Sequence, residues 1–123
     1  MTTLRFDLPL PPQRGNARDA HWAGRYRSRK AYWKHLDMLV LVKRLPKPPP
    51  EPWPAAVANV HFRLWNPMDN DNLVSRLKDV NDWLVARGYV VADRADQIRF
   101  AMFPTQAIDR RNPGVELVLE EAA

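Results

Sequence analysis

The proline-rich segment KPPPEPWP, residues 47–54, is the feature of this sequence that most limits how the chain can fold. Proline lacks a backbone N–H and has a fixed φ angle, so this run cannot continue a helix or lie in the centre of a sheet. We therefore predict an extended surface connection here, with the regular elements on either side of it.

Hydrophobic patterning predicts those elements, because alternation is typical of strands and a 3.6-residue period is typical of helices. The predicted strands span residues 4–8, 60–64, 89–91, 97–103 and 115–119. The predicted helices run from an N-cap at Ser28 to about Leu45, and from Asp71 or Asn72 to Gly88. Residues 10–27 lack periodicity and are expected to form a long basic loop. This order predicts one α+β domain with a mixed sheet and two main helices.

Composition excludes several classes of site and location. The 123 residues suit one domain, and the absence of cysteine excludes disulfides, thiolate nucleophiles and thiolate metal sites. Any bound metal must therefore be held by oxygen or imidazole. The longest apolar run, residues 38–42, is too short to cross a membrane. Arg5 and Asp7 interrupt the stretch where a signal peptide would be apolar, so we expect a cytoplasmic protein.

Basic residues are concentrated between positions 14 and 34. The chain carries a net charge of +5, and this segment holds seven basic residues and one acid. The basic residues are Arg14, Arg18, Arg25, Arg27, Arg29, Lys30 and Lys34. Clustered cations interleaved with aromatic rings favour contact with nucleic acid phosphates and unstacked bases. Two of those rings, Tyr32 and Trp33, fit equally well in a hydrophobic core.

Aspartates are concentrated further along, at Asp69, Asp71, Asp79, Asp82, Asp93 and Asp96. At about 100° per residue, one face of the predicted helix carries Asp71, Ser75, Lys78 and Asp82, and the opposite face carries Leu73, Leu77, Val80 and Leu84. Neighbouring carboxylates at Asp69 and Asp71 repel unless a cation lies between them, and Mg²⁺ suits such ligands. Taken singly, Asp71 also fits a helix cap, and Lys78 with Asp82 an ordinary surface ion pair.

The string MDNDNLVSRLKDVNDWLVARGYVVAD, residues 68–93, resembles the signature of the RusA-type Holliday-junction resolvases. That signature runs Asp-x-Asp-Asn-Leu, then a Lys, then Asp-x-Leu, then Gly and a final Asp. The matching positions are Asp69, Asp71, Asn72, Leu73, Lys78, Asp82, Leu84, Gly88 and Asp93. The segment LPLPPQRGN, residues 8–16, also resembles the opening of that family. The resemblance covers nearly the whole chain.

The resemblance implies a homodimeric, Mg²⁺-dependent endonuclease that resolves four-way DNA junctions by paired nicks, with Mn²⁺ as a substitute ion. Asp69, Asp71 and Asp93 would bind the metal, and Lys78 would lie close to the scissile phosphate. Lys78 lies seven residues after Asp71, whereas the shorter form of the signature has four, a position that is Ser75 here. Arg76 is a weak alternative to Lys78.

Two questions stay open at this point. The family's usual Asp-Asp pair reads Ala92-Asp93 here, so Asp96 competes with Asp93 for the role of third metal ligand. Two other functions also fit the sequence. One is a DNA-binding protein without catalysis, whose aspartates are caps and ion pairs. The other is a nuclease of the same fold that acts on flaps or replication forks.

Overall fold

A computed structural model describes residues 2–12, 22–92, 98–100 and 104–122. Within these ranges the elements follow the order β1 (Thr3–Leu8), α1 (Trp22–Leu41), β2 (Ala56–Leu64), α2 (Asn70–Arg76), α3 (Lys78–Ala86), β3 (Ile98–Phe100), β4 (Thr105–Ile108) and β5 (Gly114–Glu121). The fold is a small α+β domain, as the sequence predicts. No helix in the described ranges combines the length and apolarity needed to cross a membrane.

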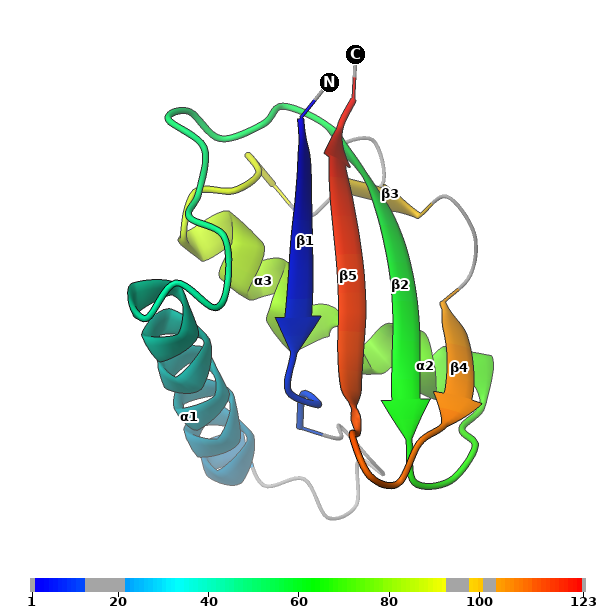
Figure 1. Cartoon of the computed structure of the whole chain (residues 1–123). Helices are drawn as coiled ribbons and strands as arrows, with labels where there is room; N and C mark the ends of the chain where they lie inside the picture. Colours follow the sequence, from blue (N-terminus) through cyan, green and yellow to red (C-terminus); the bar gives the residue numbers. More distant parts are fainter. Residues whose placement is uncertain (1, 13–21, 93–97, 101–103, 123) are drawn as a thin grey trace.

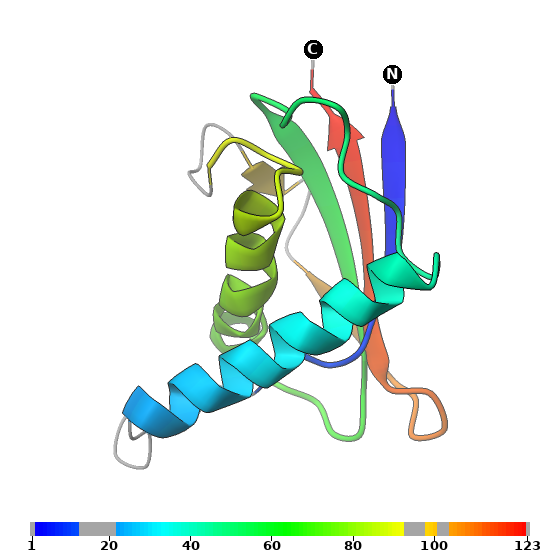
Figure 2. The ribbon, with the colours of Figure 1, turned by 90° about the vertical axis from the view of Figure 1, so that its left-hand side faces the viewer.

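The strands form one mixed sheet. β5 lies between β1 and β2 and is antiparallel to both, whereas β3 and β4 pair in parallel with opposite ends of β2. Figures 1 and 2 show α2 and α3 packed on one face of this sheet, while α1 crosses the side of the molecule next to β1. Helices α2 and α3 therefore carry most of the described part of the acidic segment, and α1 carries the described part of the basic segment.

The core lies between the sheet and the helices. Alternate residues of β2 are buried, and the predicted apolar helix face is confirmed by the burial of Leu73, Leu77, Val80 and Leu84. Burying a side chain of this size stabilises the fold by roughly 1.5–3 kcal/mol. Tyr32 and Leu36 extend the core onto α1. Tyr32 is thus a core residue, and its hydroxyl donates to Pro9 O at 2.8 Å.

Helix α1 differs from its predicted bounds at both ends. It begins at Trp22, so Ser28 lies inside the helix and the C-terminal part of the predicted loop 10–27 is wrong. Gly24 costs only about 1 kcal/mol within a helix, which a long helix tolerates. α1 ends at Leu41 rather than Leu45, because Lys43 adopts a left-handed φ of 65° and closes the helix ahead of Pro46.

The second predicted helix is interrupted. Leu77 separates α2 from α3, and its N–H bonds to Val74 O at 3.1 Å in a tightened i to i−3 turn. The 100° spacing placed positions 71 and 78 on one regular helix. The interruption at Leu77 means that they lie on two separate helices. The predicted end is confirmed, since Gly88 takes a φ of 83° after α3 and the N–H of Tyr89 bonds back to Leu84 O at 2.9 Å.

The strand predictions succeed where one face is buried and fail elsewhere. β1, β2 and β5 contain the predicted segments, and the proline-rich connection is largely exposed. Residues 89–91 form only an isolated bridge between Val90 and Trp53. The predicted strand 97–103 is represented by Ile98–Phe100, its other positions lying outside the described ranges. β4 was not predicted, because its exposed side chains do not alternate.

Candidate metal and nucleic-acid site

Asp69 and Asp71 lie where the chain enters α2. Asp69 is the N-cap residue of α2, with φ −66° and ψ 150°, yet its side chain makes no capping hydrogen bond. Both side chains are exposed, and neither has an ion pair or hydrogen bond with another described residue. The capping role that the sequence allowed for Asp71 is not seen, because Asp69 is the N-cap residue of α2 and its side chain makes no capping bond. Two solvent-facing carboxylates two residues apart are suitable oxygen ligands for Mg²⁺.

The backbone just before Asp69 is held from two sides. Gln106 of β4 accepts from Met68 N at 2.9 Å and donates to Met68 O at 2.7 Å. From α2, the Arg76 guanidinium donates to Pro11 O at 2.8 Å and lies 3.3 Å from Met68 Sδ. Burial lowers the pKa of Arg76. Arg76 thus links the N-terminal prolines to the acidic segment, and it is not exposed as a phosphate ligand would be.

Lys78 begins α3 on an acidic face. Its Nζ lies 3.2 Å from Asp82, and Arg29 of α1 lies 3.3 Å from the same carboxylate. Arg29 also lies 3.9 Å from Asp79, which is the one buried charged residue among those whose burial the structure describes. Asp82 is therefore engaged by two cations, and Arg29 connects α1 to α3. The sequence did not single out Asp79 for this role.

The remaining acidic candidates are only partly covered by the structure. Asn72 is exposed in α2, whereas Asp93 and Asp96 lie outside the described residues. Across the described positions, no three His, Asp or Glu side chains come together as a metal cluster. A Mg²⁺ ion at Asp69 and Asp71 would thus take further ligands from water or from positions beyond those ranges, where Asp93 falls.

The basic segment is spread along α1 and the connection before it. Arg14 and Arg18 lie outside the described residues, and for Arg25 the structure describes the helical backbone alone. Arg27, Lys30 and Lys34 are exposed, whereas Arg29 is half-buried. Three of the predicted phosphate-binding residues thus face solvent on one helix.

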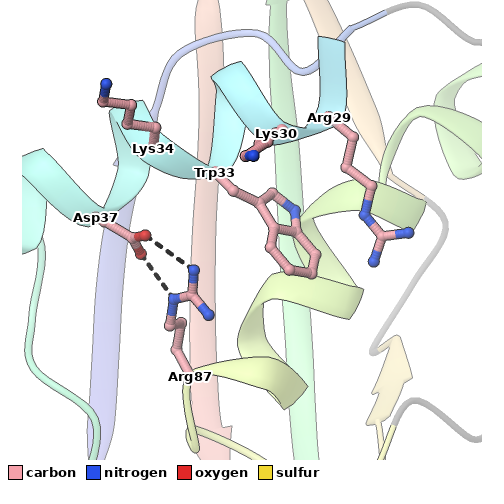
Figure 3. Close-up of a pocket in the computed structure, with 6 residues that line it drawn as sticks. All are labelled: Arg29, Lys30, Trp33, Lys34, Asp37 and Arg87. Carbon is pink, nitrogen blue, oxygen red and sulfur yellow. Dashed lines mark hydrogen bonds and ion pairs between the residues drawn. The ribbon is translucent and has the colours of Figure 1, made fainter. Parts of the chain in front are cut away.

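A groove lies between α1 and the end of α3 (Figure 3). It has a volume of about 560 Å³ and is lined by Arg29, Lys30, Trp33, Lys34, Asp37 and Arg87. Sequence reasoning missed Arg87 and Asp37, which pair through two hydrogen bonds of 2.9 Å. Those bonds hold the pKa of the Asp37 carboxyl below its usual value. Their separation of 50 positions leaves no local signal in the sequence.

A comparison with protein-family models and another with curated proteins found no match for this chain. The resemblance to junction resolvases therefore rests on the residues themselves.

Proposed function

We propose that this chain is a Mg²⁺-dependent endonuclease that cuts branched DNA. The observation that carries the proposal is the exposed pair Asp69 and Asp71, whose side chains have no ion pair or hydrogen bond with a described residue and follow a backbone segment fixed by Gln106. Exposed cations lie on α1, which crosses the side of the molecule (Figure 2) and is joined to α3 by the ion pairs of Arg29. A carboxylate pair that can bind a metal, in one domain with exposed cations that can bind phosphates, is suited to hydrolysis of a phosphodiester.

The proposed roles follow from the chemistry of each side chain. Asp69, Asp71 and Asp93 would hold Mg²⁺, or Mn²⁺ in its place, through hard oxygen ligands. When bound, the ion would activate a water molecule and neutralise charge that develops on the phosphate. Lys78 is 53% exposed, and by exchanging Asp82 for a phosphate oxygen its ammonium would add positive charge at the scissile bond. Asp82 would then orient Lys78 between turnovers.

Branched DNA is proposed because of the resemblance to junction resolvases and because of the symmetry of a four-way junction. The proposed residues Asp69, Asp71, Asp93 and Lys78 make up one active site, whereas paired nicks need two. We therefore propose an isologous homodimer, in which a two-fold axis relates two copies of the site. Each copy would cut one of two symmetry-related strands.

The test compares cleavage of a synthetic four-way junction, a fork, a flap and a linear duplex, each in Mg²⁺ and in EDTA. The expected result is paired, Mg²⁺-dependent nicking of the junction and little cutting of the linear duplex. Faster cutting of the fork or flap would reassign the substrate within the nuclease class. The ion pairs around Asp82 also suit a non-catalytic DNA-binding protein, which would bind every substrate without nicking any of them.

A further inference from the structure

The groove between α1 and α3 combines an aromatic floor with a cationic rim. The side chain of Trp33 lies at its centre, with Lys30 and Lys34 along α1 and Arg87 reaching in from the end of α3 (Figure 3). Asp37 is the only acid among the six lining residues. A volume of about 560 Å³ falls within the range of about 300–1,000 Å³ that is usual for small-ligand sites.

The Trp33 ring is held in a fixed orientation. Its Nε1 donates to Asp79 O at 2.9 Å, which ties the indole to α3. The guanidinium carbons of Arg29 and Arg87 lie 4.3 Å and 5.4 Å from the ring centroid. The side chain remains half-buried, so part of it stays open to the groove. A ring that is already oriented loses little conformational entropy when a ligand binds against it.

The residues that line the groove keep a net positive charge after the ion pair between Arg87 and Asp37 is counted. Asp37 accepts two hydrogen bonds from Arg87 and one from Trp83 Nε1 at 2.9 Å, so this acid positions Arg87. Lys34 is exposed and has no ion pair with a described residue. Flat apolar surface beside cations is the combination that binds a nucleobase together with its phosphate.

We propose that this groove binds an unpaired nucleotide of a single DNA strand, with its base against Trp33 and its phosphate at Lys34 and Arg87. The proposal deepens the proposed function and rests on it for the source of the strand, since branched DNA exposes unpaired nucleotides at its branch point. A duplex keeps its bases stacked inside, so it offers the rim its phosphates but leaves the aromatic floor without a partner.

The test measures binding of a short fluorescent oligothymidylate, and of a duplex of equal length, by anisotropy in EDTA. Trp33→Ala should weaken single-strand binding about tenfold or more and change duplex binding much less. Lys34→Glu should also weaken single-strand binding, and it should reduce the slope of log affinity against log salt by about 0.7 for each lost phosphate contact. Because Lys34 is exposed, this variant tests the groove even if Trp33→Ala unfolds.

Two control variants lie outside the groove. Trp65 is also partly stacked on a cation, with Arg110 at 5.8 Å, and Lys47 is an exposed lysine of the proline-rich connection. Trp65→Ala and Lys47→Glu should bind the oligothymidylate like the wild type. Three results would each overturn the proposal: equal losses in groove and control variants, equal losses of single-strand and duplex binding for Trp33→Ala, or no single-strand binding by the wild type. The binding measurement is made in EDTA and so does not depend on cleavage. A protein that binds as expected in EDTA but does not nick the junction in Mg²⁺ would therefore contradict only the proposed catalysis.

Discussion

At the scale of single residues, Gln106 is the contact that fixes the acidic segment to the sheet. It makes two hydrogen bonds to the backbone of Met68, directly before Asp69. We expect Gln106→Ala to lower the free energy of unfolding by about 1–3 kcal/mol, because two backbone groups lose their partner. Cleavage should fall about tenfold or more, while junction affinity should change little, since the acids would be present but poorly positioned.

The measurement for Gln106 is a pair of titrations, one of junction binding in EDTA and one of the single-turnover cleavage rate in Mg²⁺. Thr105→Ala on the same strand is the matched control, because Thr105 contacts His61 and not the acidic segment. A Gln106→Ala protein that is folded and cuts at the wild-type rate would show that the two hydrogen bonds from Gln106 to Met68 do not position the site.

Tyr89 gives the molecule a defined response to alkaline pH. Its hydroxyl donates to Pro46 O at 2.6 Å, and burial raises the pKa of Tyr89 to about 12 from an ordinary value of 10. A pKa that is raised on folding contributes stability that is complete below pH 10 and is lost as the pH rises toward 12. Burial also raises the pKa of Tyr32, which acts in the same direction.

We therefore expect the Tm of the wild type to fall steeply between pH 10 and about 12. Tyr89→Phe should have a lower Tm at neutral pH, because Pro46 O loses its donor, and a shallower fall across the alkaline window. Thermal unfolding followed by circular dichroism at several pH values measures both. Parallel curves for the two proteins would mean that Tyr89 does not control the response.

At the scale of elements, the end of α1 contains a strained residue. Lys43 has a φ of 65°, and the N–H groups of Lys43 and Arg44 close the helix on Val40 O and Leu39 O at 3.0 Å and 2.8 Å. A left-handed conformation costs a residue with a Cβ atom about 1–2 kcal/mol, and glycine avoids that cost.

Lys43→Gly should therefore stabilise the fold by about 0.5–1 kcal/mol, after the greater flexibility of glycine in the unfolded chain is subtracted. The expected rise in Tm is roughly 2–4 °C. Lys47→Gly is the control, because among the described non-glycine residues only Lys43 has a positive φ. The Tm of Lys47→Gly should stay constant or fall. The same result for Lys43→Gly would show that the left-handed conformation of Lys43 does not destabilise the fold.

The cations of α1 should divide into two groups. Arg27 and Lys34 are exposed, so replacing either with Ala should flatten the dependence of log junction affinity on log salt by up to about 0.9 for each lost contact. Arg29 faces Asp79 and Asp82, so Arg29→Ala should mainly lower stability. Binding titrations over a range of salt concentrations separate the two effects. A larger change of slope for Arg29→Ala than for the exposed pair would reverse the assignment.

The elements also show which features the sequence could predict. β1, β2 and β5 were predictable because one face of each is buried and the pattern alternates. β4 was missed because it depends on parallel pairing with β2. The role of Gln106, which lies on β4, was missed as well, because its partner Met68 lies 38 positions away. The interruption at Leu77 was missed because helical spacing alone does not report a single tightened turn. Local patterns thus predicted the acidic segment but not the contacts that hold it.

At the scale of the whole molecule, the fold places its two candidate surfaces on the helical side of one sheet. The exposed acids Asp69 and Asp71 lie at the start of α2, and the cationic groove lies where α1 meets the end of α3. The α2–α3 unit therefore connects a proposed metal site to a proposed strand-binding site. This arrangement predicts that binding and cutting can be separated by mutation, because different ends of that unit carry them.

The most direct test of the nuclease assignment measures junction cleavage in Mg²⁺ and junction affinity in EDTA for Asp71→Asn, Asp93→Asn, Asp96→Asn and Glu51→Gln. Asp71→Asn and Asp93→Asn should cut about 100-fold more slowly or worse and bind at least as tightly, because each loses a metal ligand and a charge that repels phosphates. Asp96→Asn should keep most activity. So should Glu51→Gln, whose exposed acid lies in the proline-rich connection. Wild-type cutting by Asp71→Asn, or an inactive Asp96→Asn beside an active Asp93→Asn, would contradict this metal site.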